Sequence, residues 1–312
     1  MRRFVLLAVA FVAVFSADAQ KMKKEKPATA FKTGGMLSVI VGQTGTRNWA
    51  PTGSEKFSLT AAGALNLWAT KKWGYSTWET TADLAYALIK THSQETRKID
   101  DKIDIYSNYR YGGKKGIISF SMVGALRSQF TNGYDYTETP KKRISGFFAP
   151  AYLTLSPGIH LGSKKGDFGV HIGPDVRWVI VTNEPYSLVY QGGVKPDGTE
   201  ERTLADLYGV SPGRKVRVEA GLYASAMYKK QIMKNVTWKT RVDVNSDFRG
   251  GEPTKLDVYW TNAIGMSVNK WLKVNYNFDL YHDNDVKMFG DNKNEAKTQM
   301  KSMLGVGLGI ML

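Results

Sequence analysis

The chain has 312 residues, with 43 Lys and Arg against 28 Asp and Glu, a formal net charge of +15, four His and no Cys. The absence of cysteine excludes a disulfide scaffold, thiolate catalysis, and cysteine-ligated zinc or iron–sulfur sites. The length allows one large domain or two ordinary ones. A mean hydropathy of -0.32 argues against a bundle of membrane helices. It does not argue against a β-barrel, in which apolar and polar residues alternate.

The first nineteen residues have the pattern of a secretory signal peptide. Met1-Arg2-Arg3 is basic, residues 4–15 form an apolar run, and Ala17-Asp18-Ala19 precedes Gln20. A buried N-terminal helix is the alternative, but the run is too short to anchor the chain in a bilayer. No cysteine follows the cleavage site, which argues against a lipoprotein. We therefore predict a signal peptide over 1–19, a basic tail over 20–33 and a barrel domain over 34–312.

The rest of the sequence alternates with period two, which is typical of β-strands with one apolar face. Near the C-terminus, for example, the alternate residues from Leu272 to Leu280 are apolar, and those from Lys273 to Asp279 are polar. Twelve such segments are predicted, over 35–46, 57–70, 75–91, 102–111, 117–131, 146–161, 167–182, 214–228, 235–248, 255–268, 271–283 and 299–312. They are longer than the strands of ordinary soluble sandwiches, which usually have about five or six residues.

The connections alternate between tight turns, such as Lys71 to Gly74, and longer polar loops, the longest from Asn183 to Gly213. This alternation is typical of membrane barrels with short periplasmic turns and longer outer loops. The predicted fold class is therefore all-β: an up-and-down antiparallel transmembrane β-barrel of about 12 strands in the outer membrane, with both termini periplasmic. Pro150, Pro157 and Pro174 weaken the sixth and seventh strands, so counts of ten and fourteen stay open.

The predicted register separates two faces of the barrel wall. It turns Leu59, Leu65, Phe120, Leu126, Val242 and Phe278 toward lipid. It turns a nearly balanced set of charges toward the lumen, where we expect ion pairs that brace a narrow interior. The positive members are Arg110, Arg127, Arg177, Arg217, Lys239, Arg241 and Lys273, and the negative members are Glu79, Asp83, Asp104, Asp175, Glu219, Asp243, Asp247, Asp257 and Asp279.

Many aromatic residues lie within a few positions of the tight turns, where an interfacial ring can be half apolar and half wet. The predicted girdle consists of Trp68, Trp73, Trp78, Tyr109, Tyr111, Tyr228, Trp238 and Trp271, with Tyr75 and Phe168 close by. The turns also contain ten of the lysines, whose stems can lie along lipid while the ammonium reaches the headgroups. The basic charge is therefore assigned to the membrane surface and not to nucleic acid.

Three weaker site patterns have plainer explanations. His160 and His171 flank a turn as predicted diagonal neighbours, and two histidines hydrogen-bonded inside a polar lumen are commoner than a metal or proton-relay site. Asp283-Asn284-Asp285 with Asp291 lacks the glycine and the closing glutamate of a calcium loop. A lipid hydrolase using His160 with Ser156 or Ser163 is a minor alternative. We predict no catalytic residues, no metal and no cofactor, so the protein is not expected to be an enzyme.

The last strand is expected to pair with the first, because a barrel leaves no free edge. Its residues Gly305, Gly307 and Gly309 are predicted to face inward, where an inward side chain from elsewhere could pack against them. The strand ends in Leu312 and not in the aromatic residue usual for barrel-assembly signals.

An ordered set of short motifs through most of the mature chain resembles a known family. That family is the uncharacterised outer-membrane barrels of Bacteroidetes-type Gram-negative bacteria, domain of unknown function 3078. The resemblance implies the fold and the location, and it has no activity or catalytic residues to transfer. The family pattern tends to have two glycines where this chain has Pro51-Thr52-Gly53. The motifs are Arg47-Asn48-Trp49-Ala50, Asp100-Asp101-Lys102-Ile103, Arg127 to Tyr134, Pro150-Ala151-Tyr152-Leu153, Leu155-Ser156-Pro157-Gly158, Ala205 to Val210 and Asn235-Val236.

Two functions remain open from the sequence. The first is a narrow small-solute channel or binding barrel. The second is a non-enzymatic structural or surface-interaction barrel that contacts lipopolysaccharide, protein or glycan through its outer loops. The expected partners are outer-membrane lipids, lipopolysaccharide, the barrel-assembly machinery and a small solute.

Overall fold

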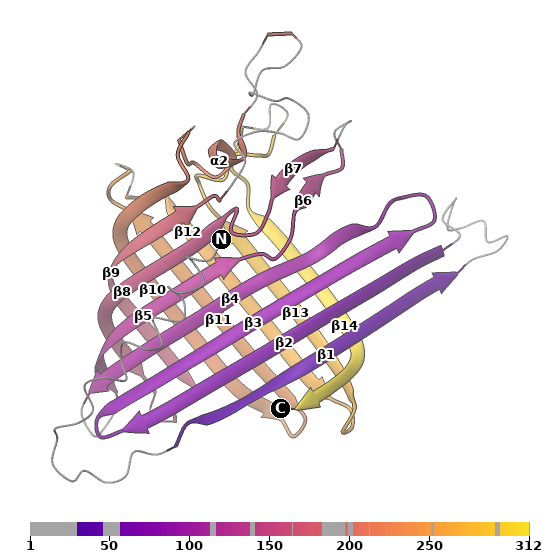
Figure 1. The fold of residues 1–312 in the computed structure, drawn as a ribbon. Coiled ribbons are helices and arrows are strands. Elements are labelled where there is room, and N and C mark those ends of the chain that lie inside the picture. Colours follow the sequence, from indigo (N-terminus) through magenta and orange to yellow (C-terminus); the bar gives the residue numbers. More distant parts are fainter. Residues whose placement is uncertain are drawn as a thin grey trace.

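The computed structural model describes residues 30–45, 57–112, 117–137, 141–163, 165–182, 197–198, 202–211, 213–250, 253–290 and 294–311. Within these ranges, twelve antiparallel strands close into one barrel (Figure 1). The predicted all-β, up-and-down barrel of twelve strands is confirmed. The barrel strands are β1 (Lys32–Gly45), β2 (Phe57–Trp73), β3 (Ser76–Thr91), β4 (Arg97–Gly112), β5 (Ile118–Ser128), β8 (Ala151–Gly162), β9 (Phe168–Ile180), β10 (Val216–Met233), β11 (Val236–Asp247), β12 (Leu256–Ser267), β13 (Leu272–His282) and β14 (Gln299–Met311).

Strands that follow one another in the chain are neighbours in the barrel, and β14 pairs with β1 to close the ring. The short connections, such as the one between Trp73 and Ser76, lie at one end, which we call the turn side. The long connections lie at the opposite end, the loop side. The predicted signal peptide, residues 20–29 of the tail and the turn over 113–116 fall outside the described residues.

A small lid covers the loop side, and the sequence did not predict its elements. It contains the two-stranded sheet of β6 (Gly133–Asp135) and β7 (Lys142–Ser145) and the one-turn helix α2 (Leu204–Leu207) (Figure 1). Thr203 caps the helix by accepting a hydrogen bond from the Asp206 amide at 3.1 Å. The buried hydrophobic cluster of the lid comprises Ala149, Val179, Val181, Leu204, Ala205, Tyr208, Val210 and Val286.

Tyr208 ties the lid together. Its hydroxyl donates to the carbonyl of Ile144 at 2.7 Å. Burial raises the pKa of this phenol well above its ordinary value, because a tyrosinate would lose its hydration there. The backbone of the neighbouring Leu207 accepts a hydrogen bond from the amide of Lys287 at 3.1 Å. The lid therefore joins segments that are far apart in the sequence.

Two of the three prolines that weaken the strand pattern share one interruption in the wall, while Pro150 directly precedes β8. Pro157 of β8 and Pro174 of β9 lie where the paired register between these strands breaks, between Leu155 and Ile159. A proline has no amide hydrogen, so neither can donate to the ladder. The Ser156 hydroxyl donates to the carbonyl of Pro174 at 2.8 Å and bridges the gap. The strands persist, which settles the count at twelve.

The outer face of the barrel is apolar and the inner face is polar, as the register predicts. Phe120 is 53% exposed on the outside, whereas Arg241 on the inside is 3% exposed. Exposed apolar side chains occur on almost every strand, including Val39, Leu59, Ile118, Ile159, Ile172, Leu222, Leu256, Trp260, Leu304 and Leu308. None of the helices in the described ranges is long and apolar enough to cross a membrane.

Candidate functional site

Four charged side chains from three strands meet in the middle of the lumen. Arg241 of β11 donates to Asp104 of β4 at 2.6 and 2.8 Å and to Asp243 at 3.0 Å. Arg127 of β5 pairs with the same Asp243, and its guanidinium lies 4.0 Å from the ring centroid of Tyr259. β4 and β11 lie on nearly opposite sides of the ring. These pairs therefore cross the lumen, and we call this group of four charged residues the central charge layer.

A second cluster lies beside the central charge layer. Lys301 of β14 approaches Asp100 of β4 at 2.7 Å and Asp279 of β13 at 3.1 Å, and Lys102 approaches Asp279 at 3.4 Å. Only Asp279 belonged to the predicted lumen set. Lys102 could have been predicted from the same alternation that places Asp104 inward, and Lys301 from the alternation that places Gly305 inward.

On the turn side, two further ion pairs join strands of the barrel. Lys239 of β11 reaches Asp83 of β3 at 3.0 Å, and Asn66 donates to the same carboxylate at 2.9 Å. Arg110 of β4 contacts Glu79 of the adjacent β3 at 2.6 Å. Because β3 and β11 are not neighbours, the Lys239–Asp83 pair also crosses the lumen.

On the loop side, two arginines hold three carboxylates, and Glu219 is shared by both. Arg177 pairs with Glu219 and Asp257, while Arg217 lies 2.5 Å from Glu219 and 2.6 Å from Asp285. Asp285 belongs to the connection between β13 and β14. Arg217 therefore joins the barrel wall to a loop-side segment of the lid.

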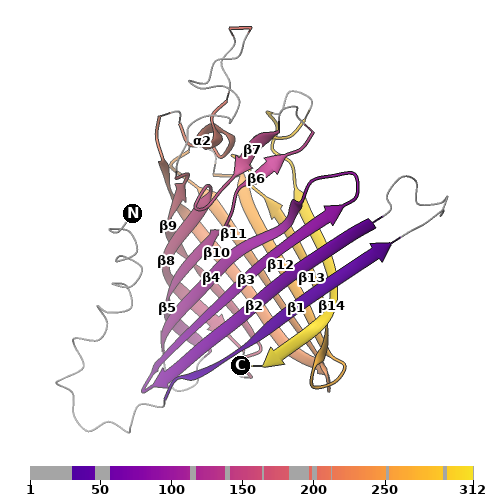
Figure 2. The same ribbon diagram turned by 45° about the vertical axis from the view of Figure 1, so that its right-hand side comes forward.

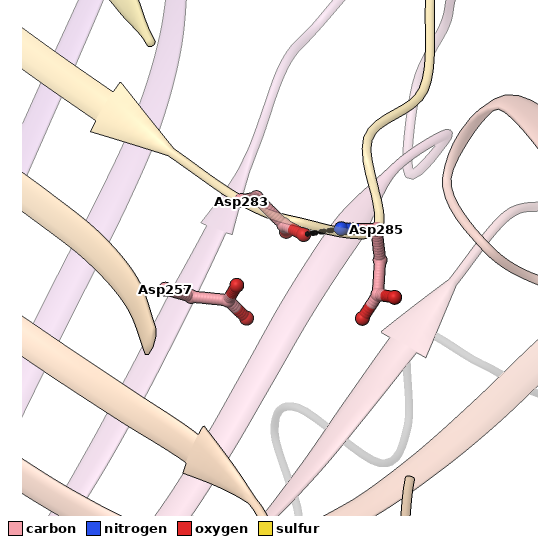
Figure 3. A group of neighbouring side chains, drawn as sticks. All are labelled: Asp257, Asp283 and Asp285. Carbon is pink, nitrogen blue, oxygen red and sulfur yellow. Dashed lines mark hydrogen bonds between the residues drawn. The ribbon is translucent and has the colours of Figure 1, made fainter. Parts of the chain in front are cut away.

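Three aspartates of this loop-side group lie close enough to suggest a metal site. Ligand oxygens of Asp257, Asp283 and Asp285 lie within 4.8 Å of one another (Figure 3). Asp257 and Asp285 are each paired with an arginine, as described above. Asp283 accepts hydrogen bonds from the hydroxyl of Tyr281 at 2.6 Å and from the amide of Asp285 at 2.8 Å. The three carboxylates are thus already held by donors of the chain, and Asp291 lies outside the described residues.

The remaining members of the predicted lumen set have hydrogen bonds. Asp175 accepts from Asn245 at 3.0 Å, and Lys273 donates to the Ser267 hydroxyl at 2.9 Å. Asp247, which we had placed among the lumen charges, caps the turn after β11, where it accepts from the amide of Arg249 at 2.9 Å. Its place at a strand end, where a turn offers free amides, accounts for the difference.

The two lumen histidines are directly opposite each other in the register of β8 and β9, not diagonal as predicted. His160 contacts Arg110 at 3.0 Å. His171 lies between Ser121, at 2.6 Å, and Ser156, at 2.9 Å. Of the two serines considered for a hydrolase, Ser156 is fully buried and contacts His171, and Ser163 donates to Asp167, so the described hydrogen bonds join neither of them to His160.

The predicted girdle needs one correction. Trp68 lies on the lumen face of β2, lines the interior cavity, and covers the Cα of Gly34 on β1. It is five positions from Trp73, and an odd separation in a regular strand places two side chains on opposite faces. On the outer face, ring centroids lie 6.0 Å apart for Trp73 and Tyr109 and 5.3 Å apart for Tyr228 and Trp238.

Of the other predicted girdle residues, Trp78 on β3 packs against Phe31 at 5.9 Å between ring centroids. Tyr111 packs against Tyr75 at 6.4 Å. Trp271 lies in the turn before β13 and is 67% exposed. Lys71 extends its ammonium to 4.8 Å from the Phe31 ring, as expected of a lysine at the end of a strand.

Two cavities occupy the described part of the lumen. The larger, about 530 Å³, lies toward the turn side and is lined by residues of β1–β4 and β12–β14 together with His160, His171 and Lys239. The smaller, about 430 Å³, lies under the lid and is lined by Arg127, Tyr152 and Tyr208 among others. Lys102, Asp279 and Lys301 line both cavities. The charged residues therefore form the boundary between two chambers.

These features define a class of protein: a closed twelve-stranded antiparallel barrel with an apolar outside, a charge-braced lumen and a lid over the loops. Comparison with known proteins adds the following. Residues 41–134 match the family described as "Protein of unknown function (DUF3078)", so the resemblance found in the sequence motifs is confirmed over this range. None of the curated proteins matches the sequence.

Among solved structures, the chain is similar to the translocator domain of autotransporter NalP from Neisseria meningitidis, with 12% identity and a TM-score of 0.35 over 98% of this chain and 95% of that one. It is also similar to the NanC porin, with 11% identity and a TM-score of 0.31 over 88% of this chain and 98% of that one. For the β domain of the Bordetella autotransporter BrkA, the values are 10% identity and a TM-score of 0.30, with 91% and 97% covered.

Proposed function

We propose that the chain spans the outer membrane as a non-catalytic β-barrel, with its lid outside and both termini in the periplasm. The support is the apolar outer face, since exposed apolar surface that continues around a whole protein marks contact with lipid. The signal peptide predicted over residues 1–19 and the turn-side aromatic pairs agree with this location. Lipopolysaccharide and phospholipid then surround the wall, and the barrel-assembly machinery inserts it.

Within that barrel, we propose that the lumen binds a small solute and does not conduct freely. This proposal rests on the position of the central charge layer: together with the charged clusters beside it, it lies between the two cavities of the lumen. Ion pairs such as Arg241–Asp104 cross the lumen, and side chains at both ends of this pair are 3% exposed. A volume of about 530 Å³ lies within the usual range of about 300–1,000 Å³ for ligand pockets.

Bilayer conductance tests the proposal directly. We expect the purified wild-type protein to show no steady single-channel current in a planar bilayer. Replacing Arg127, Arg241, Asp104 and Asp243 together by alanine should open a steady current, because the crossing pairs are then gone. A large, steady wild-type current would contradict a binding barrel. Recovery of the protein in the soluble periplasmic fraction after gentle lysis would contradict the membrane barrel itself.

A surface-interaction barrel is the second candidate, because the lid side exposes aromatic residues. Phe147 is 59% exposed and Phe130 is 40% exposed, both next to the β6–β7 sheet. Changing both to serine should leave solute binding intact and weaken adhesion of lipopolysaccharide vesicles to the reconstituted barrel. Unchanged adhesion would remove this candidate.

A further inference from the structure

The ladder that closes the barrel is far shorter than its neighbours. β1 pairs with β14 only from Met36 to Val39, opposite Leu308 to Met311. On its other edge, β1 pairs with β2 over its whole length, from Lys32 to Gly45. β14 likewise pairs with β13 from Gln299 to Leu308. We call the β1–β14 contact the seam.

Above the seam, toward the loop side, the two strands separate. If the register continued, residues 40–45 of β1 would oppose residues 302–307 of β14, but no such pairs form. In both ribbon views the loop-side ends of β1 and β2 project away from β14 (Figures 1 and 2). The ladder between the first and last strands therefore ends at Val39 and Leu308, and the loop-side parts of these two strands are not paired with each other.

Unpaired backbone at membrane depth is costly, at several kcal/mol per group in hydrocarbon, and is tolerated where it borders a water-filled cavity. The 530 Å³ chamber lies directly beside this part of the wall: Met36, Ser38 and Ile40 of β1 and Met303 and Gly305 of β14 all line it. The unpaired part of the two strands thus lies between the lipid-facing surface and the lumen.

The glycines of β14 let β1 approach closely at the end of the seam. A Cβ at Gly307 would collide with the carbonyl oxygen of Val39, and one at Gly305 would collide with Cδ1 of Ile40. Ile40 therefore occupies the space that side chains of β14 would fill. Ile40 lies at the end of the paired part of the seam, on the lumen side of the wall.

The chamber has two chemically different walls. The wall next to the seam carries small or flexible apolar side chains beside the polar Ser38, Asn66 and Asn275; the apolar ones are Met36, Ile40, Ala62, Ala64, Ala85 and Met303. The wall opposite carries more basic than acidic side chains, namely Arg110, His160, Lys239 and Lys229 beside Asp167. Lys239 is paired with Asp83 and Arg110 with Glu79, but the Lys229 ammonium has no ion pair within the described residues. An acyl chain fits the first wall and an anionic head fits the second.

We infer that the seam is a lateral gate through which a long-chain acyl amphiphile with an anionic head passes from the surrounding leaflet into the turn-side chamber. This inference rests on the proposed membrane barrel and names the class of solute it binds. The acyl chain moves from one apolar environment to another, so its transfer costs little free energy, and the attraction between the Lys229 ammonium and the anionic head favours entry. Separation of β1 from β14 is the motion that admits the ligand.

The cysteine-free chain allows a clean crosslinking test. Leu37 lies opposite Ile310 across the seam and opposite Leu65 across the full β1–β2 ladder. The pair Leu37→Cys/Ile310→Cys locks the seam when oxidised, and Leu37→Cys/Leu65→Cys is the matched control. The full-length protein is reconstituted in phosphatidylcholine vesicles, and binding of cis-parinaric acid is followed by its fluorescence.

We expect the wild type to bind parinarate saturably. Oxidation of the seam pair should slow parinarate uptake at least tenfold, and reductant should restore the rate. Oxidation of the control pair should leave the rate unchanged. Lys229→Gln should raise the Kd of parinarate about tenfold and leave that of its methyl ester unchanged. Equal uptake by both oxidised pairs, or no binding by a wild type that inserts normally, would overturn the lateral gate while leaving the membrane barrel intact. Failure of every variant and of the wild type to insert would instead count against the membrane barrel, and the gate would fall with it.

Discussion

The central charge layer allows a quantitative prediction for Asp243→Asn. Asp243 has no exposed side-chain surface and accepts from both Arg127 and Arg241. In the variant, Arg241 retains Asp104 at 2.6 Å, but Arg127 keeps only the Tyr259 ring. Removing one partner of a buried pair costs about 3–5 kcal/mol, because an uncompensated charge stays behind. Since Arg127 is 19% exposed, we expect the lower end, about 3 kcal/mol.

A double-mutant cycle isolates this interaction. Arg127→Met leaves Asp243 with its other arginine, so it should cost less, and adding it to Asp243→Asn should restore about 1–2 kcal/mol. Guanidinium chloride unfolding of the barrel in lipid vesicles, followed by tryptophan fluorescence and heat-modifiable migration on gels, measures each free energy. Glu295→Gln is the control, since Glu295 is 62% exposed and its pair with Lys297 is a surface pair.

The reasoning about the charge layer would be refuted by two results together. One is an Asp243→Asn variant that loses less than about 1 kcal/mol, a cost typical of an ordinary neutral hydrogen bond. The other is a double variant whose loss equals the sum of the two single losses, which would mean that the guanidinium and the carboxylate do not depend on each other.

Three further predictions concern the wall, the lid and the closing strand. Val242→Arg should cost about 2–4 kcal/mol, because Val242 lies midway along β11, where the cost of a lipid-facing charge is greatest; the same unfolding assay measures it, and a neutral effect would mean that Val242 does not face lipid. Burial raises the pKa of Tyr208, so the folded lid holds this proton more tightly than the unfolded chain does. The contribution of Tyr208 is therefore complete below a pH of about 10, the ordinary pKa of tyrosine, and declines above it. Limited proteolysis of the lid should accelerate above that pH in the wild type and much less in Tyr208→Phe, and equal acceleration would contradict this role. Deletion of Ile310 to Leu312 should abolish assembly, whereas Leu312→Phe should not, and a truncated protein that still reaches the membrane in heat-modifiable form would contradict closure by this strand.

The barrel could be predicted from the sequence because a strand in its wall has only two faces. Once the alternation fixes that Phe120 is outside, Arg127, seven positions along, must be inside. The same rule, applied strictly, would have placed Trp68 and Trp73 on opposite faces. Closeness to a turn places a residue at the interface, but only the parity of its position decides which face of the wall it occupies.

The pairing of lumen charges could not be predicted in the same way. Whether Arg241 meets Asp104 or another carboxylate across the lumen depends on strand tilt and stagger, which are properties of the closed ring and not of any one strand. The lid was missed for a different reason. α2 has four residues, Leu204–Leu207, too few for a helical period to show, and its stability comes from packing against segments distant in sequence.

At the seam, the sequence pattern predicts which way the residues of β14 face, but it does not predict how far β14 pairs with β1. The alternation on β14 predicted that Gly305, Gly307 and Gly309 face inward and receive side chains from elsewhere, and Ile40 and Lys273 do occupy that space. The missing side chains also remove the cross-strand pairs that would hold β14 to β1. Every other pair of neighbouring barrel strands is joined by a connection of the chain, which keeps the two strands together even where pairing weakens. The first and last strands have no such connection. A wall that must open sideways would therefore open here, and glycines on one edge of the seam make the separation less costly.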